Sequence, residues 1–301
     1  MTITHKPSAG TEAPPILREF WNLHLRRFND EIDRLLPSAD TSPSRLHSAM
    51  RHAVLAGGKR LRPILAVATH DAVGGKHDSI YAVAAALELL HTYSLIHDDL
   101  PCMDDDDQRR GQPTVHIAFD EATAVLAGDA LHALAFEILA HRAPRQVMEI
   151  VAHAIGTAGM LGGQMADLEA EGTDPNEAAV VAIHERKTGA LFIASAKTGA
   201  ILAGSNAAVI ADIEAYARPL GLAFQIVDDV LELTVDAAQL GKPADSDSRH
   251  RKITYPGAVG IEAARERAHE LIEEAKAALK GFQGDPAILR ALADFVVARN
   301  R

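Results

Sequence analysis

The feature that most constrains the fold of this chain is a succession of long segments rich in Ala, Leu and Glu, separated by Gly or Pro. Strict polar–apolar alternation, which is typical of half-buried strands, is almost absent, so the pattern favours amphipathic and buried helices. Several segments carry helix start signals, such as Ser44 before Arg45 and Asp174-Pro175 ahead of Asn176. The pattern predicts helices over 16–36, 44–56, 63–73, 79–97, 121–141, 146–162, 176–188, 190–203, 207–233, 258–279 and 285–298.

Length and composition favour one folded unit. The chain has 301 residues, of which 48% are hydrophobic, so it can bury the core of one large domain or two ordinary ones. Neither a strand pattern nor a Pro/Ser-rich linker divides its middle. We therefore expect an all-α fold, a single domain over residues 16–301 with long helices bundled around a central cavity.

Two segments and one side chain bear on localisation. Residues 1–15 contain three prolines and no apolar run, which predicts a disordered leader and no secretory signal. The apolar stretch 122–140 is interrupted by polar residues, which indicates a buried helix and no membrane span. The single cysteine, Cys102, excludes an internal disulfide and fits a cytoplasmic protein. Because neighbouring carboxylates disfavour a thiolate, a bystander role for Cys102 is favoured over a catalytic thiol.

The charge balance argues against a nucleic-acid partner. The net charge is −11 and the pI is about 5.7, whereas nucleic-acid phosphates require a basic surface. Positive charge is nevertheless gathered in two places, at Lys59, Arg60 and Arg62 and again at Arg109 and Arg110. An acidic protein with such local groups can still bind an anion.

An acidic run follows one of the apolar predicted helices. Six carboxylates fall within the ten positions 98–107, and they repel one another unless a positive charge compensates them. Pro101 should end the helix near Asp99, which puts Asp98 at the helix end and lets Asp104 return from a short loop. An exposed acidic loop is one interpretation. The other is a site for Mg²⁺, which prefers oxygen ligands and often bridges to substrate phosphates.

A second acidic group lies inside another apolar helix. Asp228 and Glu232 are four residues apart and therefore share a helix face. They either cap or pair with arginines, or they bind a cation. Two acidic sites on different helices, with lysines and arginines nearby, suggest a cavity that grips diphosphates through bridging Mg²⁺, and the apolar helices between them would line a hydrocarbon pocket.

Seven motifs give the chain a resemblance to a known family. They are Gly57–Pro63, Ser94–Asp104 with Arg109–Gly111, Leu126–Leu131, Gly162–Leu168, Lys187–Leu191, Phe224–Asp229 and Lys252–Pro256. The chain resembles the trans-isoprenyl diphosphate synthases, most closely the bacterial farnesyl diphosphate synthases. The motifs occur in the family's order, and the resemblance runs from about residue 45 to the C-terminus.

The resemblance implies a role for individual residues. The implied Mg²⁺ ligands, for several ions, are Asp98, Asp99, Asp104, Asp228 and Glu232. The implied contacts to the allylic diphosphate are Arg109, Lys187 and Lys252, with Lys242 nearby. The implied site for isopentenyl diphosphate, without metal, consists of Lys59, Arg62, His91 and Arg110. Thr188 and Gln225 would face the reacting carbons.

Product length is implied by the helix that enters the first acidic motif. Tyr93, with Ser94 beside it, lies five residues before Asp98 and would block the growing chain at C15; the less favoured alternative is that Tyr93 is an ordinary core residue. Two positions depart from the family's pattern. Glu232 stands where Asp is usual, and Arg251-Lys252-Ile253 replaces Gly-Lys-Ser, which could alter the loop that closes the site.

The expected activity is Mg²⁺-dependent condensation of isopentenyl diphosphate with dimethylallyl or geranyl diphosphate to (2E,6E)-farnesyl diphosphate. A geranylgeranyl diphosphate synthase would differ mainly in pocket depth. A terpene cyclase would not need Lys59 and Arg62 for a second diphosphate, and a non-catalytic partner subunit should have lost acidic-motif carboxylates. The family is typically homodimeric, and we expect a homodimer here.

Overall fold

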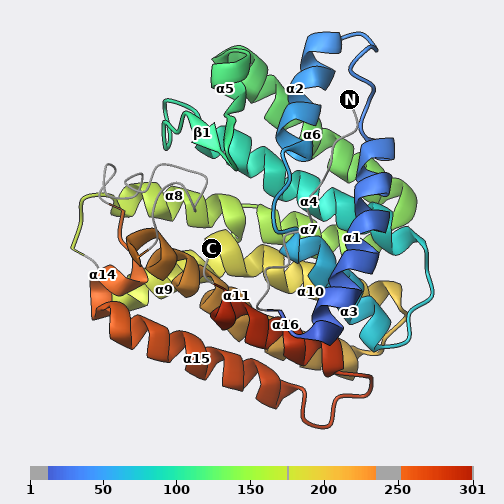
Figure 1. The fold of residues 1–301 in the computed structure, drawn as a ribbon, viewed down its shortest axis with the longest axis vertical. Coiled ribbons are helices and arrows are strands. Elements are labelled where there is room, and N and C mark those ends of the chain that lie inside the picture. The colour runs from blue at the N-terminus through green and yellow to red at the C-terminus, as the bar shows by residue number, and fades with distance from the viewer. Residues whose placement is uncertain (1–12, 175, 235–251, 300–301) are drawn as a thin grey trace.

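The computed structural model describes residues 13–174, 176–234 and 252–299, and this part of the chain is a bundle of helices (Figure 1). The helices are α1 (Pro15–Leu35), α2 (Ser44–Leu55), α3 (Leu61–Ala72), α4 (Ser79–Asp98), α5 (Val115–Ala118), α6 (Glu121–Arg142), α7 (Arg145–Ile155), α8 (Met160–Ala170), α9 (Glu177–His184), the π-helix η1 (Glu185–Gly189), α10 (Ala190–Leu202), α11 (Ala207–Thr234), α14 (Tyr255–Val259), α15 (Ile261–Ala278) and α16 (Ala287–Ala298). The predicted all-α class is confirmed.

Within the described residues, β-structure is limited to one small hairpin after the acidic run. Strands β1 (Gln108–Arg109) and β2 (Gln112–Pro113) pair antiparallel. The two turn residues, Arg110 and Gly111, both have positive φ angles, of 55° and 72°. The sequence did not predict this hairpin, because two-residue strands are too short to show alternation.

The core is built around helices that are buried on nearly every side. In α4 the side chains of Leu87, Leu89 and Leu90 are fully buried, and α4 packs against α3 and α6. Helix α10 lies between α3 and α11, and α15 covers the other side of α11 (Figure 1). Helices α4 and α6 are long and apolar enough to cross a membrane by length and composition alone, but 72% of the most apolar part of α4 is buried inside the protein, as in a core helix.

One predicted helix, over 146–162, was wrong. The structure ends α7 at Ile155 and starts α8 at Met160. Glycines make the break possible: a Cβ at Gly159 would lie 2.0 Å from the Ala154 carbonyl oxygen. Position 162 also requires glycine, because a Cβ there would lie 1.8 Å from the Thr157 carbonyl oxygen. The chain therefore turns here, and α8 runs on to Ala170, beyond the predicted end.

Other helix boundaries differ from the predicted ones by only a few residues. Ala13 is buried and α1 starts at Pro15, so the end of the predicted leader 1–15 belongs to the folded body; residues 1–12 lie outside the described part. The helix predicted from residue 258 begins at Ile261. The segments predicted as 176–188 and 190–203 form one continuous helical run, with the wider π-turn η1 between α9 and α10.

Candidate functional site

A cavity of about 730 Å³ opens between α4, α8, η1 and α11. The predicted site residues that line it are Lys59, Arg62, His91, Tyr93, Ser94, Asp98, Asp104, Arg109, Arg110, Lys187, Thr188, Gln225, Asp228, Glu232 and Lys252. Asp99 is not among the cavity residues, and Lys242 and Arg251 lie outside the described residues. Cys102 is exposed and does not line the cavity.

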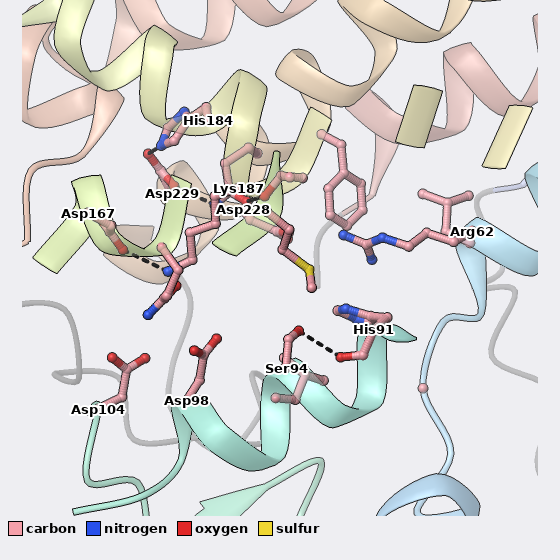
Figure 2. A pocket seen from close by; sticks show the side chains of 18 of the residues that line it. Arg62, His91, Ser94, Asp98, Asp104, Asp167, His184, Lys187, Asp228 and Asp229 are labelled. Carbon is pink, nitrogen blue, oxygen red and sulfur yellow. Dashed lines mark hydrogen bonds and ion pairs between the residues drawn. The ribbon is translucent and has the colours of Figure 1, made fainter. Parts of the chain in front are cut away.

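The first acidic group lies at the end of α4. Asp98 is the last residue of the helix, and the Asp104 amide donates to the Asp98 carbonyl at 2.8 Å, which brings the two carboxylates side by side (Figure 2). Burial raises the pKa of the Asp98 carboxyl, even with Lys187 nearby. Burial alone would also raise the pKa of Asp104, but Lys252, whose Nζ lies 2.8 Å from both Asp104 oxygens, holds that pKa below its ordinary value.

The side chain of Asp99, unlike those of Asp98 and Asp104, does not line the cavity. It is 3% exposed and accepts a hydrogen bond from Arg109 Nε at 2.6 Å. Burial raises its pKa to about 7, although Arg109 opposes the rise. The structure thus places Asp99 behind the cavity wall, where it supports Arg109.

The second acidic group faces the first from α11 (Figure 2). Asp228 forms ion pairs with Arg299 at 2.8 Å and Lys59 at 3.8 Å. Glu232, one turn further along α11, also lines the cavity. Asp98 and Asp228 therefore lie on opposing walls, as the sequence predicted from two acidic helices.

Asp229 anchors its surroundings instead of facing the first acidic group. Its carboxylate accepts from Gln225 Nε2 at 3.0 Å and from the Tyr255 amide at 2.9 Å. His184 Nε2 lies 3.4 Å from the same carboxylate. Asp229 consequently ties α11 to α9 and to the start of α14.

The π-turn η1 brings two side chains to the middle of the cavity. Lys187 Nζ lies 2.7 Å from Asp167 of α8, and Thr188 donates to Gln225 Oε1 at 2.7 Å. Burial alone would lower the pKa of Lys187, but Asp167 and Asp98 raise it, so the ammonium stays charged.

The sequence analysis had assigned no role to Asp167 or Arg299. Asp167 lies in the quoted Gly162–Leu168 motif, which could have indicated it, whereas Arg299 had no local signal.

Arg62 and His91 lie at the opposite end of the cavity from Asp98 and Asp104 (Figure 2), and the charge of Arg110 also acts on His91. Arg62 is 9% exposed, its guanidinium lies 4.9 Å from the centre of the Phe192 ring, and burial lowers its pKa to about 10. Burial and the charges of Arg62 and Arg110 lower the pKa of His91 well below its ordinary value, so this imidazole is neutral. A group of arginines beside a neutral histidine suits an anion that needs no metal.

Aromatic rings close the floor of the cavity. Tyr93 is 5% exposed, and its ring centre lies 4.9 Å from that of His132 on α6. The Phe136 ring packs edge-on against the His132 ring, with the ring centres 5.3 Å apart. The rings of His132 and Phe136 therefore form a second layer behind Tyr93. Ser94, in contrast, donates to the His91 carbonyl at 2.9 Å within the helix, which turns its hydroxyl to the backbone.

The donor set at the acidic end fits a hard divalent cation. It offers carboxylate oxygens from two facing walls, the ligands that Mg²⁺ prefers. Across the described residues, no three Asp, Glu, His or Cys side chains come together closely enough to form a complete metal site. Mg²⁺ characteristically takes one or two carboxylates and completes its shell with water and substrate phosphates, so a cation here would bind together with a diphosphate.

Comparison with known proteins decides the family. The sequence model described as polyprenyl synthetase matches residues 43–285. The chain belongs to the polyprenyl synthetase family. This polyprenyl synthetase is 42% identical to the farnesyl diphosphate synthase of Escherichia coli over 289 residues, which cover 92% of this chain and 97% of the relative. It is 45% identical to the heterodimeric geranylgeranyl pyrophosphate synthase large subunit 1 of Arabidopsis thaliana, over 90% of this chain and 76% of the relative.

A solved structure is similar over nearly the whole fold. The geranyltransferase of Helicobacter pylori, complexed with magnesium and isoprenyl diphosphate, superposes with a TM-score of 0.81 at 33% identity. The match covers 95% of this chain and 96% of that one. The chain is therefore a trans-prenyl diphosphate synthase with the isoprenoid synthase fold, and a divalent metal is consistent with its relatives.

Proposed function

We propose that this prenyl transferase is a (2E,6E)-farnesyl diphosphate synthase that condenses isopentenyl diphosphate with dimethylallyl and then geranyl diphosphate. The observation that carries the proposal is the cavity itself, because acidic walls at one end, arginines at the other and a ring-lined floor provide two diphosphate sites and a bounded hydrocarbon pocket.

The allylic diphosphate would bind at the acidic end. Asp98, Asp104 and Asp228 are the proposed ligands of several Mg²⁺ ions, and the longer Glu232 lies further along the same wall. Arg109, Lys187 and Lys252 would contact the diphosphate oxygens directly. When bound, Mg²⁺ supplies positive charge that stabilises the departing diphosphate.

Isopentenyl diphosphate would bind at the arginine end. Lys59, Arg62 and Arg110, with the neutral His91 between them, offer donors to a diphosphate without metal. Holding this substrate against the allylic carbon converts a bimolecular encounter into a positioned reaction.

The residues between the two sites would handle the carbon chemistry. After the allylic carbon–oxygen bond ionises, the cation is attacked by the isopentenyl double bond, and loss of a proton restores an alkene. The departing diphosphate, held by Lys187 and Arg109, is the proposed proton acceptor. Thr188 donates to Gln225, and Gln225 to Asp229, so lone pairs of the Thr188 oxygen can face the cation. Apolar walls exclude water, which would otherwise trap the cation as an alcohol.

Product length is the point on which the relatives differ, since they include farnesyl and geranylgeranyl diphosphate synthases. Two layers of rings at the floor, Tyr93 in front of His132, favour the shorter C15 product. A geranylgeranyl diphosphate synthase, which needs a deeper pocket, is the second candidate.

The deciding experiment incubates the protein with isopentenyl and dimethylallyl diphosphates, with and without Mg²⁺, and separates the dephosphorylated products by chromatography. Farnesol formed only with Mg²⁺ is the expected result. Geranylgeraniol would support the second candidate, a cyclic hydrocarbon a terpene cyclase, and binding without condensation a non-catalytic subunit.

The assembly is proposed to be a cytoplasmic homodimer. Three large apolar side chains are exposed on the neighbouring helices α5 and α6, namely Ile117, Val125 and Leu126. Light scattering of the purified protein should give twice the mass of one chain, and a monomer would contradict this part of the proposal.

A further inference from the structure

A buried glutamate lies beneath the arginine end of the cavity. Glu88 is 1% exposed, sits one turn before His91 on α4 and pairs with two arginines that come from different segments. Its Oε1 accepts from Arg60, and Arg110 NH2 lies 3.7 Å from the same oxygen. A carboxylate that is removed from water at such cost persists only when its partners are held firmly.

Both arginines are fixed by the backbone around them as well as by Glu88. Arg60, which is 3% exposed, also donates to the Val54 carbonyl, and Arg110 donates to the Gly57 carbonyl. Arg60 and Arg110 themselves have φ angles of 51° and 55°, a region that non-glycine residues adopt rarely. The loop 57–60 and the tip of the β1–β2 hairpin thus meet at Glu88.

Gly58 leaves the space that Arg110 fills. A Cβ at Gly58 would lie 2.6 Å from the guanidinium carbon of Arg110, so any larger residue there must push Arg110 aside. The φ angle of Gly58, 124°, adds strain to any such substitution. The position of the Arg110 guanidinium is therefore defined from three sides, by Glu88, Gly57 and Gly58.

The charge of Glu88 also matters to the neighbouring cations. Burial lowers the pKa of Arg62 and of Arg110 to about 10, and Glu88 is the leading charge that opposes this fall. Without it, Arg60 would be left as a buried cation beside Arg62 and Arg110, and the three would repel one another.

We infer that Glu88 is a positioning residue for the metal-independent diphosphate site: it holds Arg110 and the loop 57–60 so that their donors converge on isopentenyl diphosphate. The inference rests on the proposed function, in which Arg110, Arg62 and Lys59 contact that substrate. Glu88 borders the cavity, but its Oε1 is directed to the two arginines, so the role we assign to it is to hold them in place.

The test compares Glu88→Gln and Glu88→Asp with the wild-type chain. Glu88→Gln removes the charge at constant size, and the KM for isopentenyl diphosphate should rise about tenfold or more, as when the supporting partner of a ligand is lost. The KM for geranyl diphosphate, which binds at the other end, should stay within about twofold. Glu88→Asp keeps the charge and should recover part of the loss. Calorimetric titration with isopentenyl diphosphate in EDTA should show the same weakening without Mg²⁺.

Two further variants distinguish a role of Glu88 in positioning Arg110 from a general loss of packing in the protein. Gly58→Ala displaces Arg110 while Glu88 stays intact, and should reproduce the same KM split even if Glu88→Gln folds poorly. Glu214→Gln is the matched control, because Glu214 also pairs with two cations, Lys197 and Arg218, but lies away from the cavity; both KM values should stay unchanged.

The inference is overturned if Glu88→Gln and Gly58→Ala leave the KM for isopentenyl diphosphate unchanged, or if they raise both KM values by the same factor. A wild-type chain that binds isopentenyl diphosphate but makes no product would sink the proposed function alone, and the calorimetric comparison would still decide the role of Glu88. A wild-type chain that does not bind this substrate would refute both.

Discussion

Two adjacent aspartates at the end of α4 have different surroundings and should respond differently to the same change. Asp98 lines the cavity beside Asp104, whereas Asp99 points to Arg109 behind the wall. Asp98→Asn is expected to lower kcat by about 10²-fold or more, since it removes charge from the centre that stabilises the leaving group. Asp99→Asn should act through Arg109 and should lower kcat by a smaller factor. Steady-state assays of both variants test this order, and equal losses would contradict the separation.

His91 gives the protein a pH dependence whose sign follows from its lowered pKa. The unfolded chain takes up a proton near the ordinary value of 6.5, while the folded chain does not, so stability falls as pH drops through 6.5. Between pH 7.5 and 5.5 this residue should lower the free energy of unfolding by up to about 1.4 kcal/mol, the limit reached when the folded imidazole stays neutral throughout. Urea unfolding at both pH values should show that His91→Gln reduces the pH difference by this amount. A variant with the wild-type pH difference would show that His91 is protonated in the folded chain.

Tyr93 offers a prediction about product length. Tyr93→Ala removes the first ring at the cavity floor and should shift products from C15 towards C20 or longer. Because His132 lies directly behind it, Tyr93→Ala combined with His132→Ala should lengthen products further than the single change. Tyr81→Ala, which removes a ring from the same helix outside the cavity, is the control and should leave chain length unchanged. Chromatography of dephosphorylated products that still shows only C15 would remove Tyr93 from this role.

At the scale of elements, the π-turn η1 depends on close packing against α8. A Cβ at Gly163 would lie 2.3 Å from the Lys187 amide nitrogen and 2.7 Å from its Cα, and backbone cannot move aside cheaply. Gly163→Ala is therefore expected to displace Lys187 and Thr188 and to lower kcat by about tenfold or more.

Gly189 provides the matched control for this change. It lies in the same π-turn, and a Cβ there would meet nothing closer than 3.6 Å, an ordinary contact. Gly189→Ala should keep near-normal activity, measured under the same conditions. If Gly163→Ala is equally active, the contact between α8 and η1 does not position Lys187.

The elements also show how far the sequence alone can go. Apolar helices such as α4 and α11 were predicted within one or two residues, because their periodicity and end signals agree. The break between α7 and α8 was missed, since Gly156 and Gly159 act through close approaches to backbone carbonyls a few residues earlier, which the hydrophobic pattern does not reveal. Most of the described residues that the motifs indicated line the cavity. The motifs could not separate Asp99 from Asp98, since the direction of each side chain is set by where Pro101 ends the helix and by Arg109.

Arg299 and Glu88 show what motif reasoning omits. Arg299 reaches Asp228 from the C-terminal end of the chain, more than seventy positions away in sequence, through a stack on Phe224 whose ring centre lies 4.0 Å from its guanidinium carbon. Glu88 lies inside a helix that looks purely apolar on either side of it. Only the folded structure brings such residues to the site.

At the scale of the whole molecule, the cavity has two ends with opposite requirements. In the proposed function the acidic end would need cations to hold a diphosphate and the arginine end would not, so the two sites would differ in whether they require a metal.

The difference between the two ends of the cavity predicts that Mg²⁺ and a diphosphate bind cooperatively at the acidic end. Within the described residues no three acidic or histidine side chains form a complete metal site, so Mg²⁺ alone should bind weakly, and inorganic pyrophosphate should supply the missing oxygens. Thermal unfolding should therefore shift little with Mg²⁺ alone, and more with Mg²⁺ and pyrophosphate together than with pyrophosphate alone, which can occupy only the arginine end. The added stabilisation should be about 2.7 kcal/mol when the anion stands at a hundred times its Kd for the acidic end. EDTA should abolish this added stabilisation, and Asp228→Asn should reduce it. A full shift with Mg²⁺ alone would mean that the carboxylates bind the metal unaided, and the proposed order, in which cation and diphosphate enter together, would then be wrong.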